Sequence, residues 1–333
     1  MGRAVTDARL LVTALVDPSG LRLDTDWTAL IAIARAEQLI GTLAHRLDGL
    51  PVPETVAMLL ADARDAAEQG RRTALWEAEM ARRALAVTDT PVVLLKGTAY
   101  VAAGLLAGRG RSIGDLDILV PRGRIDRVEA ALIAAGWEWV KPDPYDDDYY
   151  RRWMHELPPM IHRERDRMID VHHTILPLTA RQTPDAAALI DRAVPLNDGL
   201  SVLCPADMIV HAATHLFADG DLAGGLRNLW DIHCLIDEFG TGGLADRAAH
   251  HGLLPAVARA ARLAHQLYRT DVPQQWRADA PTDALFRRRL LARDGWGRST
   301  RPVTRLAFYI RSHWLRMPPA MLARHLWIKW RRN

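Results

Sequence analysis

The sequence predicts an α+β protein in which a small mixed β-sheet core lies between an N-terminal and a C-terminal helical region. Apolar residues recur at helical spacing before residue 89 and after residue 200, whereas short β-branched runs cluster between them. With 49% hydrophobic and 25% charged residues, the composition is that of an ordinary globular protein. We expect an N-terminal helical region over 1–88, an α/β core over 89–200, a C-terminal helical region over 201–294 and a basic amphipathic tail over 295–333.

The N-terminal region shows two helical patterns. Apolar residues lie at helical spacing within 27–39, and a longer pattern rich in Ala, Arg and Glu runs from 54 to about 87. Pro51 and Pro53 interrupt the chain between the two patterns. We therefore expect the region before the sheet to be helical, with a break at these prolines.

The pattern changes after residue 90. Strands are predicted over 91–95, 115–120, 137–140, 160–162 and 168–172, with helices over 98–106 and 122–135. The Gly- and Arg-rich segment 107–114 is predicted to be a loop. The acidic segment 142–148 is predicted to form a turn, with Asp146, Asp147 and Asp148 in a solvated loop. After Pro205 the helical spacing returns over 206–217, 226–239, 255–268 and 284–291.

Cysteine content and hydropathy predict a cytoplasmic location. Cys204 and Cys234 are too few for a disulfide framework, which indicates a reducing compartment. The apolar stretch 10–16 is flanked by charged residues and is too short for a signal peptide, and no run reaches the ~18 apolar residues of a transmembrane helix.

Three aspartates in the predicted sheet indicate a metal site. Asp115 and Asp117 are two residues apart on one predicted strand, so their side chains point to the same face. Neighbouring carboxylates repel unless a cation lies between them, and Mg²⁺ prefers carboxylates together with substrate phosphates. On a later strand Asp170 faces away from Ile169 and Val171, where it can complete a site for two Mg²⁺ ions. Such a site clamps the attacking and leaving oxygens of a phosphoryl displacement.

A phosphate-binding segment is predicted just upstream. Lys96-Gly97-Thr98 ends one predicted strand and opens a helix, where backbone N–H groups favour phosphate and Gly permits close approach. Arg111 and Ser112 immediately precede the carboxylates. We therefore expect a nucleoside triphosphate to bind with Mg²⁺ at adjacent strand ends.

These motifs resemble the DNA polymerase β-like nucleotidyltransferase superfamily, whose signature is a Gly-Ser opening a helix, a DxD or DxE on the next strand and a third Asp on a later strand. More narrowly, segments 94–100, 111–120 and 169–173 are similar to a bacterial group of uncharacterised nucleotidyltransferases, as is the neighbourhood of His215 and Asp231. Thr98 stands where Ser is usual, and sixteen residues separate it from Asp115, which exceeds the usual spacing.

The resemblance implies transfer of a nucleoside monophosphate from an NTP to an acceptor hydroxyl, with loss of pyrophosphate. By position, Asp115 and Asp117 would bind both metal ions, and Asp170 would bind the ion that activates the hydroxyl. The resemblance places phosphate contacts on Lys96, Gly97, Thr98 and Arg111. The acceptor is a small molecule, a sugar or a protein side chain. The alternative is a catalytically inactive nucleotide-binding or regulatory module of the same fold.

Several histidines admit other interpretations. His211 and His215 share one helix face, and Asp231 and His233 follow on the next helix. Zinc binding needs at least three converging ligands, so we favour interhelical packing, with a lining role in the pocket as another option. The pair His155-Glu156 is placed to enter the cleft, and His172 shares the strand face of Asp170.

The tail from Gly295 to Asn333 has nine Arg or Lys residues and no Asp or Glu. Its Trp and Leu residues, from Trp314 to Trp330, alternate with these charges. We favour a helix that packs its Trp face on the body of the protein, followed by peripheral contact with an anionic membrane. Nucleic acid binding, including RNA or tRNA modification, is a less favoured alternative.

Overall fold

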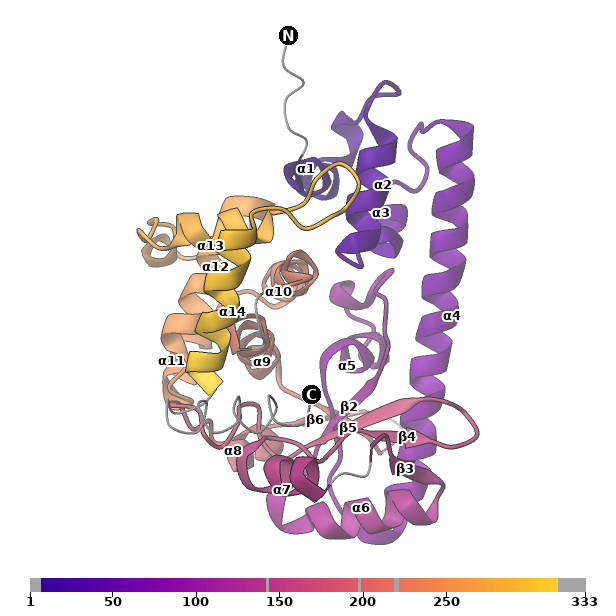
Figure 1. Cartoon of the computed structure of the whole chain (residues 1–333), viewed down its shortest axis with the longest axis vertical. Helices are drawn as coiled ribbons and strands as arrows, with labels where there is room; N and C mark the ends of the chain where they lie inside the picture. Colours follow the sequence, from indigo (N-terminus) through magenta and orange to yellow (C-terminus); the bar gives the residue numbers. More distant parts are fainter. Residues whose placement is uncertain (1–6, 142–143, 197–198, 219–221, 317–333) are drawn as a thin grey trace.

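The structure is a computed structural model that describes residues 7–141, 144–196, 199–218 and 222–316. It confirms the α+β class, because a seven-stranded mixed sheet is preceded and followed by helices (Figure 1). The buried apolar residues form one continuous cluster from Ala8 to Phe308. The helical regions at either end of the chain therefore share one core with the sheet.

Four α-helices precede the sheet. They are α1 (Arg9–Val16), α2 (Trp27–Ala36), α3 (Ile40–Arg46) and α4 (Glu54–Leu85). The 32-residue α4 contacts α3 as well as α5 and α6 beside the sheet, and it extends along one side of the molecule (Figure 1). Ion pairs at helical spacing, such as Glu68 with Arg71 and Arg72, support its exposed surface.

The sheet has the strand order β3-β4-β5-β2-β1-β7-β6. Its strands are β1 (Val93–Leu94), β2 (Leu116–Leu119), β3 (Trp137–Trp139), β4 (Met160–His162), β5 (Met168–His172), β6 (Val194–Pro195) and β7 (Ser201–Val202). The central pair, β2 and β5, is parallel, and β1 pairs with β2 in the antiparallel sense. Four helices lie between strands along the chain: α5 (Lys96–Ala102), α6 (Ile125–Ala134), α7 (Pro144–Trp153) and α8 (Ala186–Asp191).

The C-terminal helices build a second layer beside the sheet. They are α9 (Pro205–Ala218), α10 (Gly225–Phe239), α11 (Leu244–His250), α12 (Leu254–Tyr268), α13 (Asp283–Leu290) and α14 (Pro302–Arg316). Short 3₁₀ turns complete the elements: η1 (Pro18–Gly20), η2 (Ala86–Thr88), η3 (Leu106–Gly108), η4 (Arg122–Arg124) and η5 (Gln274–Trp276). The N-terminal helices pack directly on this layer, since Glu37 pairs with Arg293 at 2.7 Å and accepts a hydrogen bond from the Leu226 amide.

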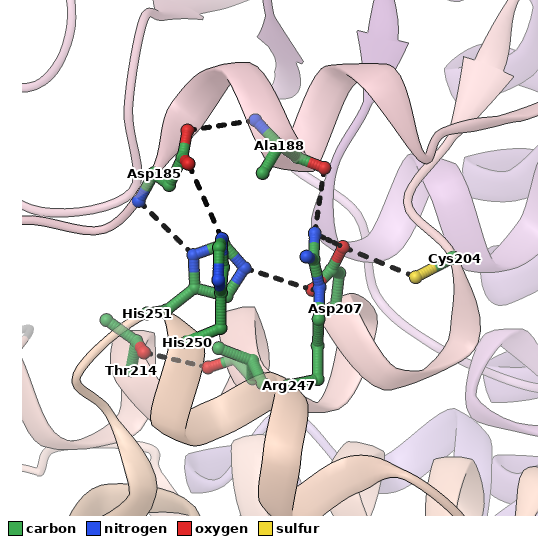
Figure 2. Close-up of polar contacts among 9 residues, drawn as sticks. Asp185, Ala188, Cys204, Asp207, Thr214, Arg247, His250 and His251 are labelled. Atoms are coloured by element: carbon green, nitrogen blue, oxygen red, sulfur yellow. Dashed lines mark hydrogen bonds and ion pairs between the residues drawn. The ribbon is translucent and has the colours of Figure 1, made fainter.

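A buried polar network fixes the N-terminal end of α9, the helix that borders the candidate site (Figure 2). Asp207 is fully buried, and Arg247 of α11 donates to both of its carboxylate oxygens at 2.6 and 2.7 Å. His251 lies 3.3 Å from the same carboxylate, and the Cys204 thiol donates to it. Arg247 also donates to the Ala188 carbonyl of α8, so one network ties α8, α9 and α11 together.

Two expectations from the sequence need correction. The segment predicted to be an acidic loop, 142–148, contains the start of α7, because Asp147 and Asp148 pair with Arg151 and Arg152 one turn later and stabilise a helix. Residues 142 and 143 lie outside the described part of the chain, as do the side chains of 144–146. The elements α1, α3, α8, α11, β6 and β7 are additional to those predicted.

The described part of the tail, α14, does not bury its Trp side chain on the body of the protein as favoured from the sequence. Trp314 of α14 is 49% exposed, whereas Phe308 and Ser312 form the buried face of this helix. Met317, Leu322, Leu326, Trp327, Ile328 and Trp330 lie outside the described residues. Within the described residues, none of the helices combines the length and apolar character needed to cross a membrane.

Candidate active site

The parallel pairing of β2 with β5 brings the acidic residues together. Asp117 is the register partner of Asp170, and Leu116 and Ile118 pair with Ile169 and Val171 in the same ladder. Because side chains alternate along both strands, the apolar residues enter the core while the two carboxylates share the other face. Asp115 lies just before β2.

The three carboxylates converge on one point. One oxygen from each of Asp115, Asp117 and Asp170 lies within 4.8 Å of the other two. Asp117 is buried, Asp170 is half-buried and Asp115 is exposed. Three carboxylates at this separation repel one another unless cations compensate their charge. The arrangement is therefore suited to divalent cations with oxygen ligands.

Asp117 is compensated by groups of the protein itself. Lys96 Nζ lies 2.6 Å from Asp117 Oδ1, and His172 Nε2 donates to the same oxygen at 2.9 Å. Burial alone would raise the pKa of Asp117, but the Lys96 charge and the hydrogen bond from His172 hold that pKa well below its usual range. Asp117 therefore stays ionised.

Asp170 lacks such compensation. Its Oδ1 atom is buried and has no hydrogen-bond partner among the described residues. Burial, followed by the charges of Asp117 and Glu156, raises the pKa of Asp170 to about 7. A buried carboxylate oxygen without a donor is costly. The donor set and the unsatisfied oxygen both fit a divalent cation held between Asp170 and the other two carboxylates.

His155 and Glu156 line the same cleft, an option that the sequence left open. Glu156 Oε2 lies 3.3 Å from His172 Nδ1, so His172 bridges Glu156 and Asp117. Burial alone would lower the pKa of His172, but the hydrogen bond to Asp117 and the charge of Glu156 raise it. His155 lies beside His172, with ring centroids 5.2 Å apart, and its pKa is well below the usual value because it is buried.

A cavity of about 460 Å³ connects these groups. It brings together seven of the eight residues predicted for the site: Lys96, Gly97, Arg111, Ser112, Asp115, Asp117 and Asp170. The eighth, Thr98, does not line it. Thr98 is 1% exposed and its buried hydroxyl has no partner among the described residues.

Arg111 explains why residue 97 is glycine. A Cβ atom added at Gly97 would lie 2.0 Å from Arg111 Nη1, so no side chain fits there. The Arg111 guanidinium is buried and donates to both oxygens of Asp231, and its Cζ lies 5.5 Å from the Tyr100 ring centroid. The long segment between Thr98 and Asp115 thus returns Arg111 onto the start of α5. Its charge is already offset by Asp231.

Three residues of the C-terminal helices also line the cavity. His211 and His215 of α9 face it, which agrees with the lining role considered from the sequence, and burial holds the pKa of His211 well below its usual value. Arg227 of α10 also lines it and donates to Gln38 at 2.6 Å. A single Arg in a helix gave no sequence signal for this position.

The zinc alternative finds no support in the described residues. Asp231 pairs with Arg111, and His233 shares a hydrogen bond with Thr270 on the far side of α10. The His211 and His215 rings are 6.4 Å apart without a third ligand group. These residues therefore serve packing and cavity lining.

Comparison with family models gives a match to one described as "Uncharacterised nucleotidyltransferase", over residues 24–269. The match covers most of the 333-residue chain, including the sheet and the helices as far as α12. Comparison with curated proteins gives no match.

Proposed function

This chain belongs to the family of uncharacterised nucleotidyltransferases, and we propose that it transfers a nucleoside monophosphate from an NTP to an acceptor hydroxyl. The observation that supports this reaction most strongly is the convergence of Asp115, Asp117 and Asp170 beside a cavity of about 460 Å³. The acceptor oxygen forms a bond to the α-phosphorus as the bond to pyrophosphate breaks, and the hydroxyl proton leaves.

Asp115, Asp117 and Asp170 would hold two Mg²⁺ ions. Such ions neutralise the charge on the phosphates and stabilise the attacking and leaving oxygens of the displacement. The donor set fits, because all three ligands are carboxylates and Asp170 Oδ1 has no partner among the described residues.

The Asp170 carboxylate is also placed to accept the proton of the acceptor hydroxyl. Without a cation, burial and the charges of Asp117 and Glu156 raise its pKa to about 7; a bound divalent cation would lower that pKa and keep the carboxylate ionised, as a proton acceptor must be. His172 keeps the neighbouring Asp117 ionised and in place through its hydrogen bond to Oδ1. Two adjacent carboxylates therefore have different protonation behaviour and different roles.

The triphosphate would lie against Lys96 and Arg227, with Gly97 and Ser112 beside it. Arg227 is partly buried and makes no ion pair among the described residues, so its charge is available to a phosphate. Arg111 lines the cavity too, but its bidentate pair with Asp231 makes it a positioning residue for α5 and α10.

The alternative is a nucleotide-binding or regulatory module without turnover. One observation favours it: the Lys96 ammonium lies 2.6 Å from Asp117 Oδ1 and competes with a metal ion for that carboxylate. If the protein is active, Lys96 would contact the triphosphate while Asp117 would help to hold the metal ion.

A pair of measurements tests the function. Titration calorimetry with ATP and Mg²⁺ measures binding, and a pyrophosphate-release assay with small-molecule, sugar and protein acceptors measures turnover. We expect both from the wild type and binding without release from Asp170→Asn. Binding by the wild type without release from any acceptor would establish the non-catalytic alternative.

A further inference from the structure

A second cavity of about 170 Å³ is lined by residues of α9, α12 and α14. In the C-terminal layer, α9 packs against both α12 and α14 (Figure 1). Its wall is largely apolar and includes the buried side chains of Phe217 and Leu253, together with Leu315 of α14. Two arginines, Arg259 of α12 and Arg311 of α14, supply the positive charge of the wall.

This cavity adjoins the one that contains the carboxylates. Leu176 and Pro177 line both cavities. Helix α9 borders both as well, with His211 facing the first and Phe217 the second. A whole ligand usually occupies ~300–1,000 Å³, so a space of this size fits only part of a ligand, with the remainder in the neighbouring cavity.

The two arginines line one cavity and contact the same aromatic ring. Arg259 Cζ lies 4.5 Å from the Phe286 ring centroid, and Arg311 Cζ lies 5.3 Å from it. Arg311 donates to the Phe217 carbonyl at 3.1 Å and makes no ion pair in the described part of the chain. Arg259 Nε is buried and has no hydrogen-bond partner there either.

Among the described residues, Asp283 is the carboxylate that pairs with the arginines beside this cavity. Asp283 Oδ1 lies 3.8 Å from Arg259 Nε, but the same carboxylate accepts a hydrogen bond from Arg262 at 2.8 Å. Burial lowers the pKa of Arg259, and burial together with the Arg259 charge lowers that of Arg311. An anion bound in the cavity that both arginines line would satisfy the Arg259 donor and offset the excess positive charge.

We propose that this second cavity is the acceptor subsite and binds an apolar group that bears a carboxylate or another organic anion. The assignment to the acceptor rests on the proposed function, whereas the anion site itself does not. In the reaction, the acceptor's hydroxyl at its opposite end attacks the α-phosphorus of the NTP, its proton passes to Asp170, and pyrophosphate leaves.

Equilibrium dialysis with octanoate, in the absence of nucleotide and metal, tests the anion site. We expect octanoate to bind at least about tenfold more tightly than octanol or acetate, because only octanoate has both an apolar body and a charge. Arg311→Met and Arg259→Gln are each expected to weaken octanoate binding at least about tenfold, and Arg311→Lys less. Equal affinities for octanoate and octanol, or an unchanged affinity in folded Arg311→Met, would overturn the site.

Matched variants separate this result from misfolding and from the chemistry. Arg305→Met removes an exposed arginine from the same helix and should bind octanoate as the wild type does. Asp117→Asn should also retain binding, because that residue is in the other cavity. Circular dichroism and thermal melts show which variants are folded, and Arg259→Gln tests the site should Arg311→Met fail to fold.

Pyrophosphate release from ATP and Mg²⁺ tests the acceptor role. We expect 8-hydroxyoctanoate to stimulate release and octanoate to inhibit it, and Arg311→Met to raise KM for 8-hydroxyoctanoate about tenfold with little change in kcat. Stimulation that is the same in Arg311→Met, or release with other acceptors that octanoate does not inhibit, would overturn the acceptor assignment. Octanoate binding without release from any acceptor would instead count against the transferase function and support the anion site.

Discussion

Asp117 and Asp170 are register partners on parallel strands, yet their surroundings shift their pKa values in opposite directions. The pKa of Asp117 is held low by Lys96 and His172, whereas that of Asp170 is raised to about 7 by burial and by neighbouring carboxylates. One carboxylate is thus compensated by groups of the protein, whereas we propose that a cation compensates the other. Four predictions from the structure follow from these and related contacts.

The first prediction concerns the pH dependence of stability without metal. The folded pKa of Asp170, about 7, lies above the ~3.9 of an unfolded aspartate, so its contribution to stability is full below about pH 4 and is lost as the pH rises through 7. Asp170→Asn should therefore raise the free energy of unfolding by about 1–3 kcal/mol at pH 8, and by less at pH 5.

Urea unfolding across this pH range, with and without Mg²⁺, measures the effect. Mg²⁺ should stabilise the wild type more than Asp170→Asn, because a ligand that binds only the folded state raises its stability and the variant retains only Asp115 and Asp117 as ligands. Identical pH profiles and identical Mg²⁺ effects for the two proteins would show that Asp170 has no cation site.

The second prediction concerns turnover. Asp117→Asn removes a charge but hardly any volume, and should lower pyrophosphate release at least about 100-fold while the protein still folds. Some stability is lost as well, because Lys96 and His172 then face a neutral amide. The matched control is Asp126→Asn on the exposed surface of α6, which should retain activity. Wild-type turnover in Asp117→Asn would exclude the two-metal reaction.

Much of the fold was predictable from the sequence, because local patterns determine it. Strands β4 and β5 have the predicted bounds, and the alternation around Asp115, Asp117 and Asp170 correctly placed the carboxylates on one face. In contrast, β6 and β7 have two residues each, which is too short for a periodic signal. Helix α7 was missed because Pro144 and a run of acids resemble a turn, although ion pairs one turn apart stabilise a helix.

The partners of the site residues were not predictable, because long-range pairing has no local signature. Arg111 and Asp231 are 120 residues apart in the chain, and their ion pair changes the interpretation of Arg111 from phosphate contact to positioning residue. The burial of Thr98 also depends on how α5 packs on its neighbours. That Arg227 lines the cavity becomes visible only in the folded structure, where α10 lies beside the sheet.

The third prediction separates the cations of the cavity. Arg227→Met and Lys96→Ala should each weaken ATP binding about tenfold, since each removes a charge that we place beside the triphosphate. Both should lower the free energy of unfolding less than Arg111→Met does. Arg111→Met should instead reduce the free energy of unfolding by about 3–5 kcal/mol, because it leaves the buried Asp231 unpaired. Calorimetric titration and urea unfolding of each variant provide the test. Unchanged ATP affinity in Arg227→Met and Lys96→Ala would remove them from the phosphate site.

The fourth prediction concerns a membrane surface. Val303, Leu306, Ile310 and Trp314 form an exposed apolar stripe at helical spacing on α14, in a segment with no acidic residue. We therefore predict co-sedimentation with phosphatidylserine vesicles and little with neutral phosphatidylcholine vesicles. Replacing Leu306 and Ile310 with Ser should lower the bound fraction at least about tenfold. Equal sedimentation of the double variant and the wild type would count against this surface.

The most direct test of the central claim is a crystal structure with a non-hydrolysable ATP analogue and Mn²⁺, in which the anomalous signal locates the ions. We expect the triphosphate beside Lys96 and Arg227, and manganese bound by carboxylate oxygens of Asp115, Asp117 and Asp170 at about 2.0–2.3 Å. A nucleotide bound elsewhere, or no ion within ligand distance of Asp170, would contradict the account.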